Sequence, residues 1–233
     1  FKGDDDITNI SEESHQYIKN QIKDATYGFF VPHSINIKNI MYKGGAQWMG
    51  ASVDNKNGIM YVPSNDIPTF IWLEENNKKN TYYKYTMRGK IIKDQFGYPG
   101  SRPPWGRITA INLNTGKIIW KIPFGEYEEL TKKNIPITGT FNYGGVTATA
   151  GGLVFATGTL DNKIRAFDAK TGKELWSYRL PFSGSSPPTI YEYNNEQYVL
   201  VSATGSISMR KAFPKISKSG NKIYAFKIKK IYN

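Results

Sequence analysis

The stretch that decides the fold is ITAINLNTGKIIW at residues 108–120, which returns as IRAFDAKTGKELW at residues 164–176. In both copies the residues before Thr-Gly alternate in side-chain character, as in a strand with one buried face. Gly116 and Gly172 each supply a turn residue that tolerates a positive φ, and a second strand that carries a Trp follows. Each copy is therefore predicted to be a β-hairpin.

The spacing of the two copies indicates a repeat architecture. They lie 56 residues apart, and a third strand of the same kind, IYAF at residues 223–226, follows 59 residues after the second. A repeat of this length with β signals and no helical spacing of apolar residues is typical of the four-stranded blades of a β-propeller. Residues 144–150 and 153–158 add two strands joined at a Gly-Gly turn, which completes one blade.

The repeat predicts one partial, all-β propeller domain. We expect a linker with a short helix at residues 1–43, followed by blades at 44–124 (with an insertion at 68–104), 138–180 and 184–230, all within a domain at 44–233. Three blades do not close a ring, which takes four to eight, so the open blade faces would meet water. The sequence thus predicts part of a larger ring.

The amino-acid sequence of the second blade resembles the C-terminal region of pyrroloquinoline-quinone (PQQ) dehydrogenases. The resemblance is carried by GGVTATAGGLVF at 144–155, TLDNKIRAFD at 159–168 and TGKELW at 171–176. It reaches back to GGAQW at 44–48 and to VPHS at 31–34, which is similar to the family's Pro-Pro-Ser linker. Membrane-type glucose dehydrogenases are the branch that the chain resembles most.

The resemblance implies about three blades of an eight-bladed quinoprotein ring with tryptophan-docking hairpins. It implies PQQ and calcium on the ring axis, and oxidation of a sugar or alcohol hydroxyl in the periplasm with transfer of electrons to a quinone or cytochrome acceptor. In the family the catalytic base and the calcium ligands come from earlier blades, whose motifs are absent here. We therefore expect no catalytic residue and no metal ligand in this chain, partner blades from an upstream segment or a second chain, and no activity alone.

Two candidate cofactor-binding residues follow a Gly-Gly pair. The resembled family often places an amide or another polar group beside a Trp at this point, and Gln47 and Trp48 stand there. An amide can hydrogen-bond a quinone carbonyl or carboxylate, while an indole offers an N–H donor and a flat stacking face. The alternative interpretation places Trp48 in the core and Gln47 at a capped strand end.

Two further candidates, Ser185 and Ser186, lie in a loop where the family shows Gly-Gly-Gln-Ala-Thr-Pro at the inner rim of the ring. This sequence keeps Gly184 and Pro188 but has Ser185 in place of the Gln and Pro187 in place of the Thr. The resemblance implies that Ser185 and Ser186 face the cofactor. A plain turn between blades would explain the Ser, Gly and Pro equally well.

The amino-acid composition of the chain limits the classes of partner and site that we expect. The net charge is +12, yet we expect no nucleic-acid partner, because lysines at propeller edges also keep strands from pairing with other chains. The chain has no Cys, which excludes disulfides and thiolate metal sites, and it has no apolar run long enough to span a membrane. A second class of function fits the same repeat: a non-catalytic propeller scaffold of the outer-membrane assembly type, without a cofactor.

Overall fold

The computed structural model describes residues 1–77 and 82–227, which divide into two compact units. The first unit combines Phe1–Gly45 with Asp66–Trp105, and the second combines Ala46–Asn65 with the chain from Gly106 onward. Strand β4 (Ile59–Glu75) runs through the boundary, so its residues up to Asn65 belong to the second unit and the rest to the first.

The second unit contains two whole antiparallel sheets and the antiparallel part of a seven-stranded sheet whose other strands belong mostly to the first unit. Blade A contains β3 (Ser52–Asp54), the first part of β4, β6 (Gly106–Asn112) and β7 (Ile118–Pro123). Blade B contains β8 (Asn142–Ala148), β9 (Leu153–Thr159), β10 (Lys163–Asp168) and β11 (Glu174–Arg179). Blade C contains β12 (Thr189–Tyr193), β13 (Glu196–Ala203) and β14 (Lys222–Lys227). Within each blade, strands that follow one another along the chain pair antiparallel. This is the meander of propeller blades.

The two repeated hairpins form as the sequence predicts. β6 pairs with β7, and β10 with β11, each with a register shift just before the turn. In the second hairpin the carboxylate of Asp168 accepts a hydrogen bond from the backbone N–H of Thr171 at 2.8 Å. Gly116 and Gly172 have φ values of 68° and 73°, the left-handed conformation that the turn requires.

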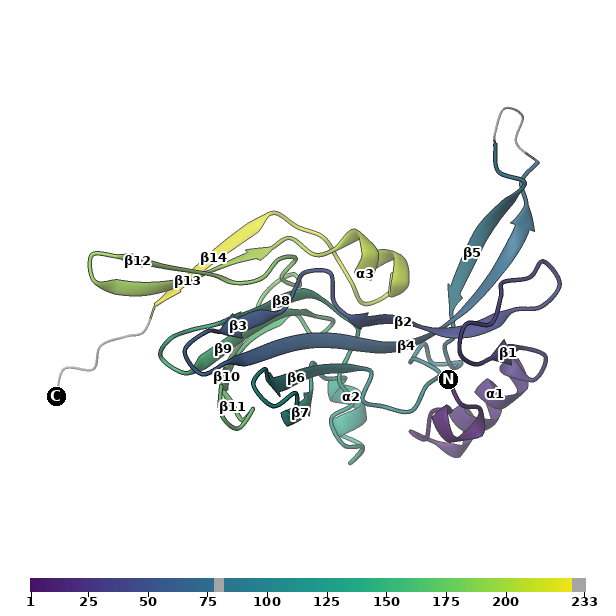
Figure 1. Cartoon of the computed structure of the whole chain (residues 1–233), viewed down its shortest axis with the longest axis horizontal. Coiled ribbons are helices and arrows are strands. Elements are labelled where there is room, and N and C mark those ends of the chain that lie inside the picture. The colour runs from purple at the N-terminus through teal and green to yellow at the C-terminus, as the bar shows by residue number, and fades with distance from the viewer. Residues whose placement is uncertain (78–81, 228–233) are drawn as a thin grey trace. The chain divides into compact units, whose positions relative to one another are not determined.

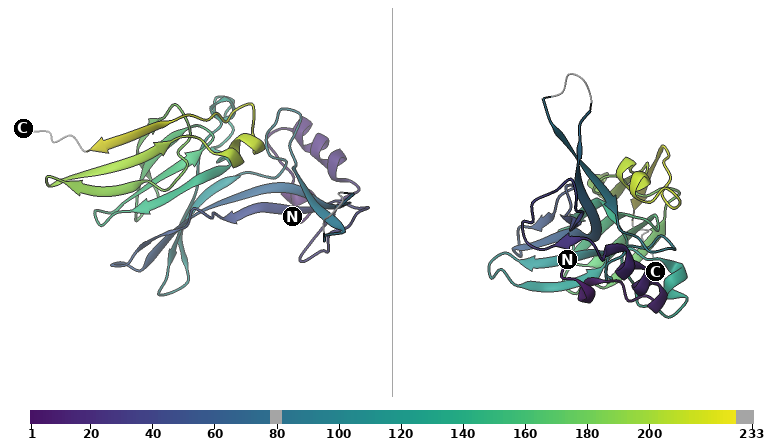
Figure 2. Two further views of the ribbon diagram at one scale, coloured as in Figure 1. Left: turned by 90° about the horizontal axis from the view of Figure 1, so that it is seen from above. Right: turned by 90° about the vertical axis from the view of Figure 1, so that its right-hand side faces the viewer.

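Consecutive blades pack face to face (Figure 2, left), and the Trp of one hairpin seals the first of these contacts. The buried Trp120 of blade A donates its indole N–H to the carbonyl oxygen of Ala169 in the turn of blade B, at 3.0 Å. The hydroxyl of Tyr61 donates to the same carbonyl at 3.2 Å. A Cβ at Gly172 would lie 2.9 Å from the Trp120 ring, so glycine is needed for this close packing.

The first unit joins a helix to a small sheet. It contains the 3-10 turn η1 (Asp4–Asp6), α1 (Glu12–Ile22), β1 (Thr26–Tyr27), most of β2 (Asn39–Ala46), the rest of β4 and β5 (Tyr85–Ile91). The Ser11 hydroxyl caps α1 by accepting from the Ser14 N–H at 3.1 Å. Ile18, Phe70 and Ile92 share its core.

The segment expected as an insertion at 68–104 is built largely from a long hairpin. The second half of β4 pairs with β5 from Thr69↔Ile91 to Glu75↔Tyr85, and the hairpin projects from the first unit (Figure 1). Two short helices, α2 (Glu128–Thr131) and α3 (Ile207–Ala212), lie in connections of the second unit. Among the described residues, no helix has the length and hydrophobicity to cross a membrane.

Candidate cofactor-binding site

Gln47 is buried, and its side-chain oxygen lacks a partner. Its backbone N–H donates to the carbonyl oxygen of Pro63 in β4 at 2.9 Å, and its own carbonyl accepts from Gly50 at 3.0 Å, which closes a tight turn. The side chain is 7% exposed, and within the described part of the chain Oε1 accepts no hydrogen bond. A buried amide oxygen without a donor costs free energy, so this atom is ready to accept from a bound group.

Trp48 lies at the surface beside it. Its side chain is 85% exposed, so the alternative interpretation that Trp48 belongs to the core is wrong. The physical reason is the turn at residues 47–50: Trp48 lies within this turn and precedes β3, so it does not continue a strand. The indole is therefore accessible to a bound group, and no hydrogen bond engages its N–H within the described residues.

Ser185 and Ser186 lie in the connection between blades B and C. The N–H of Ser185 donates to the carbonyl oxygen of Ser202 at 3.0 Å, and its hydroxyl lies 2.6 Å from the hydroxyl of Thr204. Both serines are half-buried. Ser185 is thus already engaged with β13 and the residue after it, whereas its hydroxyl retains further hydrogen-bonding capacity because a hydroxyl has one donor and two acceptor positions.

The turn that carries Gln47 and Trp48 meets the loop that carries the two serines at Gly145. A Cβ built on Gly145 would lie 2.7 Å from Cγ of Pro187 and 3.2 Å from Cβ of Met49. Gly145 has a φ of 99° and lies at a register shift in β8, a bulge that lets three chain segments approach. The structure therefore brings all four candidates to one edge of blade B, which we call the rim.

An asparagine pair that sequence reasoning missed lies at the same end of β8. The Asn142 amide donates to the carbonyl oxygen of Ser64 at 2.9 Å and to Oδ1 of Asn65 at 2.8 Å, while Asn65 donates back to the Asn142 carbonyl at 2.9 Å. These bonds fix which side of the Asn142 amide donates. Its Oδ1 is buried and, in the described part of the molecule, accepts no hydrogen bond. Asn142 is a fifth candidate.

The rim offers hydroxyls, amides and an aromatic face, but no carboxylate. Hydroxyl donors can hold the carboxylates and carbonyls of a planar quinone, and the exposed Trp48 ring can stack on it. The unpartnered amide oxygens of Gln47 and Asn142 can accept from an N–H or O–H of the same group. Among the described residues no group of three or more His, Cys, Asp or Glu side chains could hold a metal ion. The residues present fit an organic acid or quinone, and they do not provide a calcium site.

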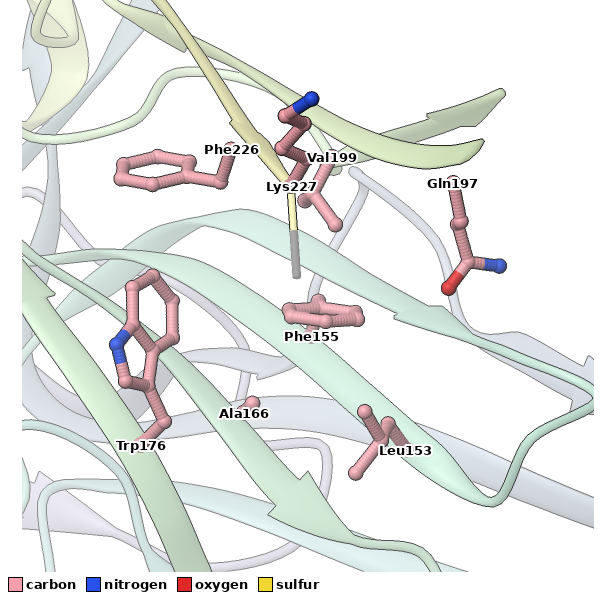
Figure 3. Close-up of a pocket in the computed structure, with 8 residues that line it drawn as sticks. All are labelled: Leu153, Phe155, Ala166, Trp176, Gln197, Val199, Phe226 and Lys227. Atoms are coloured by element: carbon pink, nitrogen blue, oxygen red, sulfur yellow. The ribbon is translucent and has the colours of Figure 1, made fainter. Parts of the chain in front are cut away.

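An apolar cavity of about 300 Å³ lies elsewhere, between blades B and C (Figure 3). Leu153, Phe155, Ala166, Trp176, Val199 and Phe226 line it, with Gln197 and Lys227 beside them. One of its lining residues, Leu153, begins β9, whereas the rim lies near the other end of that strand. None of the rim candidates lines it. Trp176 is 38% exposed here, against 9% for its repeat partner Trp120.

Comparison with known proteins assigns the class. Residues 2–199 match the family described as PQQ: glucose/ethanol/alcohol dehydrogenase, β-propeller domain. The chain belongs to this family of quinoprotein dehydrogenases, whose members use PQQ and a metal ion. The expected family and the expected propeller fold are confirmed.

Individual relatives agree with the family. The chain is 32% identical over 236 residues to the glycerol dehydrogenase large subunit of Gluconobacter oxydans (strain 621H), with 86% of this chain and 32% of the relative covered. It is 37% identical over 115 residues to the quinoprotein glucose dehydrogenase of Escherichia coli (strain K12), covering 47% of this chain and 14% of the relative. It therefore spans at most about a third of the length of these relatives.

Solved structures show the same fold. A quinohemoprotein alcohol dehydrogenase from Pseudomonas putida HK5 superimposes with a TM-score of 0.58 at 20% identity, covering 82% of this chain and 28% of that one. A europium-containing methanol dehydrogenase gives a TM-score of 0.55 at 22% identity, with 76% and 32% covered. In both cases the chain corresponds to a portion of a larger propeller.

Proposed function

We propose that this chain supplies three blades, over residues 44–233, of a PQQ-dependent dehydrogenase that oxidises a sugar or alcohol hydroxyl. Gln47, Trp48, Ser185, Ser186 and Asn142 hold one edge of the cofactor. The catalytic base and the calcium ligands come from the remaining blades, in an upstream segment or a second chain, so the chain is inactive alone. The complete enzyme works in the periplasm and passes electrons to a quinone or cytochrome acceptor.

One observation carries the assignment of the site. Three segments far apart in the sequence converge on Gly145, and they bring the buried amide oxygens of Gln47 and Asn142 to one end of blade B without partners among the described residues. A structural amide usually finds a partner within its own fold, because an unpaired buried polar atom costs about 1–3 kcal/mol. Two such oxygens at one edge favour a site that is completed by a bound group or by a missing blade.

The quinone, when bound, accepts the two electrons of the substrate's oxidation. The rim residues bind and orient the cofactor. The hydroxyls of Ser185 and Ser186 donate to carboxylate or carbonyl oxygens. The side-chain oxygens of Gln47 and Asn142, which lack a partner among the described residues, accept from an N–H or O–H of the bound group. The exposed indole of Trp48 covers one face and excludes water from it. A rigid edge of this kind holds a cofactor in one position relative to the substrate.

The test is a titration of the purified chain with PQQ in the presence of calcium. Binding is followed through the absorbance of PQQ and the fluorescence of Trp48, first with the chain alone and then with the upstream segment added. Dye reduction with glucose and with simple alcohols follows. We expect activity only in the reconstituted pair, and we expect quenching that is lost in the variant W48F but kept in W176F.

The outcomes separate two classes of function. Binding and activity in the pair support the dehydrogenase. A complete ring that binds no PQQ at any calcium concentration would overturn it and favour the non-catalytic scaffold. Activity of the chain alone would contradict the expectation that the base and the metal ligands lie outside it.

A further inference from the structure

A basic surface lies on the long connection between β13 and β14. We call residues 206–222 the basic excursion. It contains the exposed side chains of Arg210, Lys211, Lys215, Lys218 and Lys222. From residue 197 to residue 233 the sequence has no Asp or Glu. Surfaces usually intersperse both signs of charge, so a segment with charge of one sign creates a local positive potential.

The basic excursion is held in place from within. Met209 and Phe213 are buried, and the Phe213 ring packs on Phe141 with centroids 5.7 Å apart. The Ser206 hydroxyl caps α3 by accepting from the Met209 N–H at 3.4 Å. The N–H of Gly220 donates to the carbonyl of Thr204 at 3.0 Å, which closes the base of the excursion. The cationic side chains therefore project from a fixed backbone, which lowers the entropy lost when a partner binds.

In the part of the chain that the structure describes, these cations form no ion pair. The ion pairs of the described residues involve other cations, such as Lys163 with Glu128 and Arg165 with Glu174, and none of them involves Arg210, Lys211, Lys215 or Lys218. Arg210 contacts the neutral hydroxyl of Ser219 at 3.0 Å. On one side the excursion adjoins carboxylates, because Ile216 lines a pocket with Glu126, Glu128 and Glu129. The charge available to an external anion is therefore that of the exposed side chains that form no ion pair in this part of the chain, Arg210, Lys211, Lys215 and Lys218.

The excursion adjoins the rim. The N–H of Gly205 donates to the carbonyl of Ser183 at 2.9 Å, two residues before Ser185. Phe141, on which Phe213 packs, directly precedes Asn142. A partner that binds the excursion would therefore lie close to the candidate cofactor residues.

The chemistry of the surface favours a protein over other polyanions. The only aromatic side chain of the excursion that precedes β14, Phe213, is buried, so no ring is available to stack on nucleic-acid bases. Its exposed apolar side chains, Ile207 and Ile216, belong to a six-residue helix and the following loop, far less than an interfacial membrane helix presents. Dispersed lysines with small apolar contacts between them suit a folded surface that carries carboxylates.

We propose that the basic excursion is the docking surface for an acidic protein. In the dehydrogenase proposed above this partner is the electron acceptor, and that part of the inference rests on the proposed function; the docking surface itself does not. Carboxylates on the partner pair with Arg210, Lys211, Lys215 and Lys218, while the exposed Ile207 supplies apolar contact beside them.

The experiment measures charge recognition without PQQ, so it can fail or succeed independently of the dehydrogenase. A fluorescein-labelled polyglutamate peptide is titrated with the whole chain, and anisotropy is followed at about 50 mM and about 200 mM salt. The test variant is R210E/K211E/K215E/K218E. The matched control, K117E/K121E/K170E/K173E, changes the net charge equally at exposed positions of the two hairpins. Circular dichroism verifies that both variants fold.

We expect the wild type to bind the polyglutamate peptide at low salt. The affinity of the test variant for the peptide should be at least about tenfold lower, and that of the control variant should lie within about threefold of the wild type. Equal losses in both variants would reduce the effect to net charge and overturn the proposal, as would absence of wild-type binding at low salt. Vesicles of phosphatidylcholine and phosphatidylglycerol form a second arm: tighter binding to vesicles than to the peptide, lost in the test variant, would assign the surface to a membrane instead.

Discussion

The indole N–H of Trp120 donates to the carbonyl oxygen of Ala169 at 3.0 Å, across 49 residues of chain. This bond joins the hairpin of blade A to the turn of blade B, and the Trp120 ring covers Gly172 in the same turn. Each blade has an apolar face that must be covered by a neighbour, and the docked Trp completes that cover at the outer edge. The repeated Trp is therefore a contact between repeats and not only a residue within one.

The first prediction concerns this contact. Trp120→Phe keeps an aromatic ring but removes the donor, and Tyr61 still donates to the Ala169 carbonyl. We expect a loss of about 1–2 kcal/mol in the free energy of unfolding. Trp48→Phe is the matched control because Trp48 is exposed, and it should change stability by less than about 0.5 kcal/mol. The free energies of unfolding are measured by urea unfolding followed by circular dichroism. Equal losses in the two variants would contradict the docking role of Trp120.

The hairpins were predictable from sequence because their determinants are local. Alternation, a Thr-Gly turn and a Trp at a fixed offset specify strand, turn and strand without reference to the rest of the chain. The division into units was not predictable in this way. β4 is a single strand of 17 residues that contributes to both units, and its continuity depends on pairing with β6 at one end and β5 at the other.

The second prediction concerns a buried ion pair in blade B. Arg165 donates Nη1–H to Oδ1 of Asp161 at 3.1 Å, and both side chains are buried. Burial alone would raise the pKa of Asp161, but the hydrogen bond and charge of Arg165, with the Thr159 hydroxyl, hold the pKa below its ordinary value. Asp161→Asn leaves a buried guanidinium with reduced compensation. We expect a loss of about 3 kcal/mol at neutral pH.

The pH dependence of this variant has a definite sign. Because the folded-state pKa of Asp161 is lowered, its stabilisation is complete above the unfolded-state value of about 4 and is lost as the pH falls through the lowered folded-state value. The stability difference between wild type and Asp161→Asn should therefore shrink in acid. Glu192→Gln, at an exposed position, is the control and should cost less than about 0.5 kcal/mol. If the difference in unfolding free energy between wild type and Asp161→Asn stays constant from pH 7 to about pH 3, the lowered folded-state pKa of Asp161 is refuted.

The third prediction tests the convergence at Gly145. Gly145→Ala adds a Cβ that would lie 2.7 Å from Pro187 and 3.2 Å from Met49, at a φ of 99°. Gly116→Ala also has a positive φ but meets no atom within 4 Å, so it isolates the backbone strain. We expect a loss of about 1 kcal/mol for Gly116→Ala and about 3 kcal/mol for Gly145→Ala. If urea unfolding shows equal losses of unfolding free energy for Gly116→Ala and Gly145→Ala, the contacts of Gly145 with the two rim loops contribute nothing to stability.

The candidate site could be found only in part from the sequence. Gln47 and Trp48 follow a Gly-Gly pair and are visible as a local motif, but the exposure of Trp48 is a tertiary outcome, since large aromatic residues are usually well buried. Asn142 carries no local signal. Its unpartnered oxygen is defined by bonds to Ser64 and Asn65, more than 75 residues earlier, and such a pairing is set by blade packing.

The last prediction separates a binding role for Gln47 from a structural one. Gln47→Leu replaces a buried amide, whose oxygen lacks a partner among the described residues, by an apolar side chain of similar size. Without cofactor the variant should be as stable as the wild type or up to about 1 kcal/mol more stable, because an unpaired polar atom is removed. In the reconstituted pair, PQQ should bind about tenfold more weakly, the equivalent of about 1.4 kcal/mol. Gln197→Leu makes the same chemical change beside the apolar cavity and should leave PQQ affinity unchanged. A Gln47→Leu protein that is destabilised but binds PQQ normally would show that the amide supports the fold and not the cofactor.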